Sequence, residues 1–172
     1  MNVATIKKRD IANGPGVRVS LFVSGCTHRC EGCFNEIAWD FAYGEPFTPE
    51  VEASLFEALA PDFIAGLTLL GGEPFEPENQ RALLPFLRRV REKFPHKTIW
   101  CYSGFTLEQL TGESRARCLV TDEMLSLLDV LVDGRFILAQ KNIRLRFRGS
   151  ENQRLIDMNK TRETGEIVLW DD

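Results

Sequence analysis

Apolar residues along the chain form short continuous runs, which alternate with stretches in which apolar residues recur every three or four positions. Continuous runs bounded by turn residues predict buried strands, whereas the helical spacing predicts amphipathic helices. Strands are therefore expected at residues 17–23, 67–70, 97–102 and 130–132, with weaker patterns at 144–148 and 167–170. Helices are expected from residue 49 onward, at 83–94 and at 121–128.

Two prolines bear on these helices. Thr48-Pro49 is a typical helix start, in which the threonine side chain caps the helix and the proline occupies its first turn. Pro85 lies inside the second helical pattern. It should kink that helix or shift its start, because proline lacks the backbone N–H and crowds the preceding turn.

This alternation predicts an α/β fold of mostly parallel strands joined by right-handed helical crossovers. A complete eight-stranded barrel needs roughly 250 residues. The 172 residues are therefore expected to form a single-domain partial (βα) barrel. Ligands collect at the carboxyl ends of such strands. Four segments with unusual chemistry fall at these ends: the loop 24–35, Gly71-Gly72-Glu73, Ser103-Gly104 and Asp133-Gly134.

The loop 24–35 contains three cysteines, Cys26, Cys30 and Cys33, with the spacing Cys-x3-Cys-x2-Cys. Three thiolates on a four-iron cluster leave one iron without a protein ligand, whereas an electron-transfer cluster takes four cysteines. An iron with an open position can bind a substrate or cofactor, as a catalytic zinc ion does. The motif therefore predicts chemistry at a [4Fe–4S] cluster, with these three cysteines as its ligands.

Two other interpretations of the cysteines are weaker. A structural zinc site would need His28, which is crowded between two ligands, unlike the usual paired spacings. A disulfide framework fits poorly with five cysteines, because the number is odd and three of them are crowded together. Cys101 lies in an apolar run and is expected in the core, while Cys118 stands alone. His28 is expected near the cluster, where it can tune the metal site.

The segment Gly71-Gly72-Glu73-Pro74 allows two interpretations. By itself it is a tight strand-to-helix turn, in which glycine relieves backbone strain. Beside the cysteine loop, we interpret it as an open backbone edge that approaches a ligand closely. Glu73 would then accept hydrogen bonds from a charged amine.

Composition and charge argue against several classes of function. Hydrophobic residues are 44% and charged residues 27% of the chain, as in ordinary globular proteins. The net charge of -4 argues against a general nucleic-acid binder, which would be basic. No apolar run reaches membrane-spanning length, and residues 1–10 lack the apolar stretch of a signal peptide. We therefore expect a cytoplasmic protein, since a reducing compartment suits thiolate ligands.

The cysteine motif followed by Gly71-Gly72-Glu73 resembles the radical S-adenosylmethionine superfamily. Further segments resemble one family within it, the activating proteins of anaerobic ribonucleoside-triphosphate reductases: NGPGVR at 13–18, LFVSGC at 21–26, CFN at 33–35, WCYSGF at 100–105, VLVDGRF at 130–136 and RGSENQ at 148–153. The resemblance covers residues 13–153. Gly32 departs from it, because many superfamily members have an aromatic residue before the last cysteine. The tail at 158–172 carries no family motif, and its role stays open.

The resemblance implies a cofactor and the residues that hold it. Cys26, Cys30 and Cys33 would bind three irons of the cluster, and S-adenosylmethionine would chelate the fourth. One-electron reduction would then cleave the cofactor to methionine and a 5′-deoxyadenosyl radical. The residues implied in cofactor binding are the backbone at Gly32, Cys33 and Phe34 for the adenine, Gly71, Gly72 and Glu73 for the methionine amino group, and Ser103 and Asp133 for the ribose or carboxylate. A Cβ at Gly72 is expected to intrude on the methionine.

The resemblance also implies a protein substrate, a glycine of the reductase that becomes a stable glycyl radical. The electron would come from an external reductant such as flavodoxin. Arg144, Arg146 and Arg148 alternate along an expected strand, and this face either docks an acidic partner or is simply solvated. Three alternatives stay open: an activase of another glycyl-radical enzyme such as pyruvate formate-lyase, a small-molecule radical S-adenosylmethionine enzyme, and a metal-binding module without catalysis.

Overall fold

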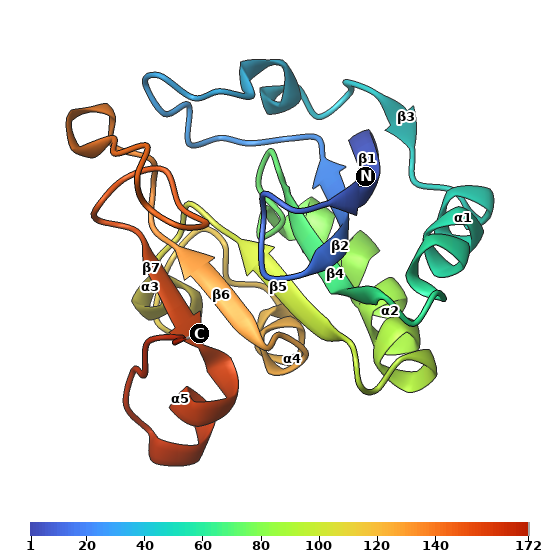
Figure 1. The fold of residues 1–172 in the computed structure, drawn as a ribbon. Helices are drawn as coiled ribbons and strands as arrows, with labels where there is room; N and C mark the ends of the chain where they lie inside the picture. The colour runs from blue at the N-terminus through green and yellow to red at the C-terminus, as the bar shows by residue number, and fades with distance from the viewer. Residues whose placement is uncertain (172) are drawn as a thin grey trace.

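The strands of the described part of the chain form one seven-stranded sheet in the order β3-β1-β2-β4-β5-β6-β7 (Figure 1). The computed structural model describes residues 1–171. The strands are β1 Asn2–Asp10, β2 Val17–Val23, β3 Glu45–Pro46, β4 Ile64–Gly71, β5 Thr98–Tyr102, β6 Val130–Asp133 and β7 Arg154–Asp157.

The four central strands β2, β4, β5 and β6 pair in parallel, whereas β1, β3 and β7 pair antiparallel at the two sides. The α/β class and the mostly parallel sheet are therefore confirmed. The carboxyl ends of the parallel strands point to the upper part of Figure 1. The blue loops after β2 and the orange segment after β6 lie on that side.

Within residues 1–171 there are five α-helices and two 3-10 helices, of which α5 follows the last strand and the others lie between strands: α1 Pro49–Leu59, α2 Pro77–Lys93, α3 Leu107–Thr111, α4 Thr121–Ser126, α5 Met158–Thr164, η1 Glu36–Trp39 and η2 Leu138–Gln140. The start of α1 is as predicted, because the Thr48 hydroxyl accepts a hydrogen bond from the Val51 N–H and Pro49 is the first helical residue.

The two faces of the sheet have different partners because successive side chains of a strand point to opposite sides. On one face, Ile99 and Cys101 of β5 belong to the main core, together with apolar residues of α1, α2 and α4. On the other face, Trp100 packs with Val130 and Val132 in a second cluster that includes Phe147 and Trp170. The helices therefore cover one face, and loops and the tail cover the other.

The second face also holds a buried arginine. Arg18 is 0% exposed, and its guanidinium donates to the hydroxyls of Thr68 and Thr98 and to the carbonyl of Leu67. The group also lies 5.7 Å from the ring centroid of Trp100. Burial lowers the pKa of Arg18 to about 10, so the group stays charged at neutral pH. The Thr68 hydroxyl in turn donates to the carbonyl of Asn13, which anchors the 13–18 segment on the sheet.

Both of the weaker strand predictions are wrong. Residues 144–148 form turns, because β7 takes the edge of the sheet beside β6. Phe147 has a φ of 62°, which a strand does not allow, and its ring packs on Trp100 instead. Residues 167–170 contribute only the bridge between Leu169 and Ile156. The first segment alternates polar and apolar residues and the second is apolar throughout, but neither finds a full-length strand partner.

The helix predictions need one correction, and several elements were not anticipated. The structure starts α2 at Pro77, and the helix continues through Pro85. Pro85 is exposed, so the hydrogen bond that it cannot make lies on the solvent side of the helix. Neither β1 nor β7 was predicted. No helix within residues 1–171 is long and apolar enough to cross a membrane.

Candidate functional site

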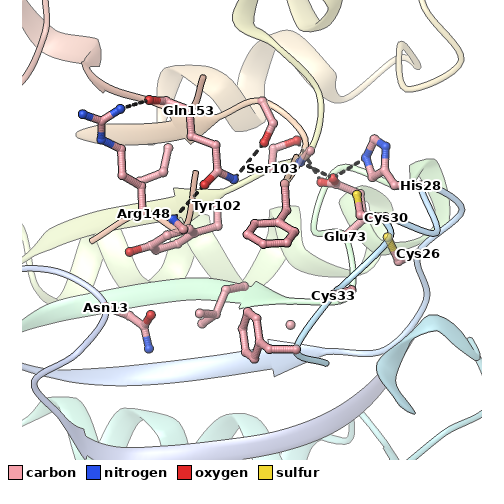
Figure 2. Close-up of a pocket in the computed structure, with 18 of the residues that line it drawn as sticks. Asn13, Cys26, His28, Cys30, Cys33, Glu73, Tyr102, Ser103, Arg148 and Gln153 are labelled. Atoms are coloured by element: carbon pink, nitrogen blue, oxygen red, sulfur yellow. Dashed lines mark hydrogen bonds and ion pairs between the residues drawn. The ribbon is translucent and has the colours of Figure 1, made fainter. Parts of the chain in front are cut away.

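A cavity of about 410 Å³ lies at the carboxyl ends of the parallel strands, within the range typical of small-molecule and cofactor sites. Figure 2 shows Cys26, Cys30, His28 and Glu73 at one end of this cavity and Asn13 and Arg148 toward the other. The wall combines the cysteine loop, the ends of β4, β5 and β6, and the segment that follows β6.

All three cysteines of the motif line the cavity. They are free thiols; Cys26 is 9% exposed, and Cys30 and Cys33 are partly exposed. Within residues 1–171, no three His, Cys, Asp or Glu side chains are grouped to hold a single metal ion. A [4Fe–4S] cluster does not require three side chains that meet at one metal ion, because each thiolate binds a different iron. The donor set therefore fits a cluster with three protein ligands.

The thiols differ in their surroundings. Burial, together with the nearby Glu73 carboxylate, raises the pKa of the Cys26 thiol to about 12. Iron that binds Cys26 must therefore displace a proton. Cys101 is confirmed as a core residue, since it is fully buried on the helix-covered face and burial raises its pKa well above the ordinary value.

The residues between the first two cysteines are attached to the turn after β4. His28 Nε2 lies 2.7 Å from Glu73 Oε1, and the imidazole packs edge-on against Phe105 at 4.5 Å. Because a carboxylate only accepts, the imidazole nitrogen is the donor. The backbone N–H and hydroxyl of Thr27 both donate to Glu76, at 3.0 and 2.7 Å. The cysteine loop is therefore fastened to the segment between β4 and α2.

Glu73 is 1% exposed, and both of its carboxylate oxygens are used. Oε1 accepts from His28 and from the Gly104 N–H at 2.7 Å, and Oε2 accepts from the Phe75 N–H and the Ser103 hydroxyl at 2.9 Å each. Four donors compensate the buried charge. The carboxylate thus joins the cluster loop, the glycine turn and the end of β5 into one unit (Figure 2).

Replacing His28 with leucine is expected to destabilise the metal-free protein by about 1.5–3 kcal/mol, because a buried carboxylate loses one of its donors. His28→Gln keeps a side-chain N–H and should recover much of this loss. Urea unfolding of the metal-free wild-type and variant proteins measures the difference. Equal stability of the leucine and glutamine variants would show that the hydrogen bond to Glu73 contributes little.

The two glycines of the turn after β4 lie against the backbone of neighbouring segments, so close packing explains why glycine stands at both positions. Gly71 has a φ of +114°, and a Cβ there would meet the Val23 nitrogen at 2.5 Å. A Cβ at Gly72 would meet the carbonyl oxygen of Gly25 at 2.5 Å. The sequence predicted that a Cβ at Gly72 would intrude on the cofactor. In the structure its first obstacle is the cluster loop itself.

The structure places Gly32 and Phe34 in the cavity wall beside Cys33. Gly32 has a φ of +76°, and a Cβ there would lie 2.8 Å from the Leu138 side chain. An aromatic residue would therefore be strained at this position, which explains the departure from the superfamily pattern. The Phe34 side chain is 87% exposed, so the residue can offer its backbone to a ligand while its ring faces solvent.

Ser103 and Asp133 have different positions relative to the cavity. Ser103 lines it, with its hydroxyl bound to Glu73. Asp133 is 0% exposed and is not among the lining residues; its carboxylate accepts from the Leu107 N–H and from Arg154. The adjacent Gly134 lines the cavity instead. Asp133 thus binds the first N–H of α3, whose cap residue is Thr106, and a strand-end position does not reveal this tertiary role.

The cavity also contains residues that the sequence reasoning did not assign. Tyr102, Gly134 and Gln153 line it, and all three lie in segments on which the family resemblance rests. Gln153 connects the walls: its side chain accepts from the Gly149 N–H and donates to the Gly134 carbonyl. Trp39 also lines the cavity, and no motif drew attention to it.

Comparisons with known proteins agree with this site. The family model described as a 4Fe-4S single cluster domain matches residues 12–156. The anaerobic ribonucleoside-triphosphate reductase-activating protein of Pasteurella multocida is 42% identical over 155 residues, 89% of this chain and 95% of the relative. The proteins of the same name from Haemophilus influenzae and Enterobacteria phage T4 are 43% and 39% identical, and they cover 89% and 90% of this chain and 96% and 93% of their own lengths. The chain therefore belongs to the family of anaerobic ribonucleoside-triphosphate reductase-activating proteins.

Proposed function

We propose that this protein activates an anaerobic ribonucleoside-triphosphate reductase by generating a glycyl radical on it. The observation that carries the proposal is the convergence of three free thiols and the Gly71-Gly72-Glu73 turn on one cavity. The chain matches these relatives over almost their whole lengths, and their names support the same activity.

In this proposal Cys26, Cys30 and Cys33 hold a [4Fe–4S] cluster. When bound, the cluster and S-adenosylmethionine supply the one-electron reduction and the 5′-deoxyadenosyl radical. The chain contributes the loop that presents the thiolates. Hydrogen bonds to Glu73 and Glu76 would hold this loop in place beside the glycine turn.

The remaining cofactor contacts are proposed from the cavity wall. Carbonyl groups of Gly71 and Gly72 would accept from the methionine amino group, with the Glu73 carboxylate adding negative charge behind them. The backbone at Gly32, Cys33 and Phe34 would contact the adenine, and Ser103 would lie near the ribose or carboxylate. Asp133 would act less directly, through its neighbour Gly134 and its hydrogen bond to the first N–H of α3.

The apolar part of the wall would protect the radical. Leu70, Val132 and Phe136 line the cavity together with the ring of Tyr102. The Tyr102 hydroxyl donates to the Phe147 carbonyl at 2.6 Å, which directs the polar end of the side chain away from bulk water. These apolar side chains would limit the access of water and of side reactions to a reactive carbon radical.

We propose that the sheet works as a single-domain partial (βα) barrel whose open side admits the partner. Phe34 and Ile143, 87% and 90% exposed, both line the cavity. Lys141 and Arg144 are exposed in the same wall segment. Apolar residues with cations beside them suit an acidic protein partner, although the chain itself carries a net charge of -4. The reductase would approach here, and an external reductant such as flavodoxin would supply the electron.

The test is electron paramagnetic resonance of the cluster-loaded, reduced protein mixed with S-adenosylmethionine and the reductase. A glycyl doublet is expected on the reductase, because the amide groups beside the glycine stabilise its radical and make hydrogen transfer downhill. Holding the two reacting groups in contact can supply about 7–11 kcal/mol of the barrier. A reductase variant with alanine at the target glycine serves as the control.

The alternatives give different results in the same assay. Cofactor cleavage without a doublet and without reductase activity would favour a small-molecule radical S-adenosylmethionine enzyme. A doublet on pyruvate formate-lyase but not on the reductase would favour the other activase. Absence of cofactor cleavage would favour the third alternative, a metal-binding module without catalysis. A reducing compartment, as in the cytoplasm, is proposed because all five cysteines are free thiols.

A further inference from the structure

One buried donor at the cluster end of the cavity has no acceptor. The indole Nε1 of Trp39 is buried and has no hydrogen-bond partner among residues 1–171. A buried N–H without an acceptor is costly, so such groups usually have a partner in the functional state. Asn79 Oδ1 is the other such side-chain atom in the described part of the chain, and Asn79 does not line the cavity.

Trp39 is fixed beside the metal ligands. It is the last residue of η1, and its carbonyl accepts from the Cys26 N–H at 3.1 Å. The guanidinium of Arg29, between the first two cysteines, lies 5.5 Å from the centroid of the indole ring. Trp39 and all three cysteines line the same cavity. The indole is therefore held against the loop that would carry the cluster, by contacts on both its backbone and its ring.

We propose that the Trp39 indole N–H donates a hydrogen bond to a sulfur atom of the cluster, either a cysteine thiolate or a bridging sulfide. The proposal rests on the proposed function only in requiring a cluster on Cys26, Cys30 and Cys33. Sulfur atoms of iron–sulfur clusters accept hydrogen bonds, and these bonds are one of the means by which proteins set the reduction potential.

The sign of the effect follows from charge. Reduction adds one electron to the cluster, and a hydrogen bond to sulfur stabilises the more negative state. The Trp39 N–H should therefore raise the reduction potential relative to a protein without this donor. A higher potential eases electron uptake from the external reductant, so Trp39 would balance ease of reduction against the reducing power needed to cleave the cofactor.

The test compares Trp39→Phe with the wild type by potentiometric titration of the reconstituted cluster without S-adenosylmethionine. Phenylalanine keeps an aromatic ring under Arg29 but removes the donor. A more negative midpoint potential is expected, together with loss of an exchangeable proton coupling to the reduced cluster in electron–nuclear double resonance spectra. Trp170→Phe is the matched control, because Trp170 packs on Trp100 away from the cavity lining and should leave the potential unchanged.

Stability of the metal-free protein separates this role from a purely structural one. Because no residue among 1–171 accepts from the Trp39 N–H, Trp39→Phe removes no hydrogen bond within the chain and should unfold at nearly the wild-type temperature when metal-free. An unchanged midpoint potential with an unchanged proton coupling would overturn the proposal. Weaker S-adenosylmethionine binding at an unchanged potential would also overturn it, by assigning the donor to the cofactor.

The outcome is independent of the reductase. A protein that shows the potential shift but forms no glycyl radical would retain this inference and lose the proposed function. A protein that forms the glycyl radical with an unshifted potential would do the reverse. A wild-type chain that took up no iron and sulfide would overturn both.

Discussion

Replacing Cys30 with alanine is expected to remove nearly all iron and sulfide from the reconstituted protein and to abolish cleavage of S-adenosylmethionine. Among residues 1–171, three thiols line the cavity, and Cys30 is one of them. A four-iron cluster with one open iron needs three protein ligands, and the variant would keep only two. The same result is expected for alanine at Cys26 and Cys33.

The two remaining cysteines provide controls in the same chain. Cys118 is partly buried and its thiol lies 3.5 Å from Gln80 Oε1, and neither it nor Cys101 lines the cavity. Cys118→Ala and Cys101→Ala should therefore keep the cluster. Iron and sulfide analysis with the visible absorption spectrum measures the difference. Normal cluster content in Cys30→Ala, or loss of the cluster in Cys101→Ala, would contradict the ligand assignment.

Replacing Gly72 with alanine is expected to lower cofactor cleavage about 100-fold, because a shift near 1 Å in the site can have that effect. The new Cβ would lie 2.5 Å from the Gly25 carbonyl oxygen and 2.9 Å from that of Ala38. Both obstacles are backbone, so the turn or the cluster loop must move. Overpacking of this kind costs about 1–3 kcal/mol of stability. Cluster content should fall together with affinity for S-adenosylmethionine.

Gly165→Ala separates this effect from general destabilisation. Gly165 ends α5 with a φ of +76°, and a Cβ there would meet nothing within 4 Å. Its replacement should cost about 1–2 kcal/mol through backbone strain alone. Cluster content and cofactor binding should be unchanged. If Gly72→Ala matched Gly165→Ala in every measurement, close approach of the turn to the cluster loop would have no functional consequence.

Local patterns were sufficient where neighbouring residues decide the structure. The strand predicted at 17–23 has those same bounds, and Thr48-Pro49 starts α1 as expected. The parallel arrangement followed from strands that alternate with helices, because such strands require crossover connections. The same reasoning brought the cysteine loop and Gly71-Gly72-Glu73 to one end of the sheet, where they share a cavity.

The wrong strand prediction at 144–148 and the missed strand β1 share a different cause. The sequence pattern at 144–148 suits a strand, but pairing needs a free edge, and β7 occupies that edge. β1 was missed because it is mostly polar, with exposed lysines at positions 7 and 8. Its pairing with β2 compensates for the weak apolar pattern. Strand formation at the sides of a sheet thus depends on which neighbours are available, and that information is distributed over the whole chain.

The candidate chemistry of this protein was predicted from its sequence, because three thiols and a glycine turn are properties of short segments. The partners of the charged groups were decided only by the tertiary structure. Glu73 meets His28 from 45 positions away, and Asp133 meets Arg154 from 21. Trp39, which lines the cavity beside the cysteine loop, is left with a buried donor that has no acceptor among residues 1–171. Burial makes each polar group find an acceptor or donor, and only the folded chain determines which groups come within reach.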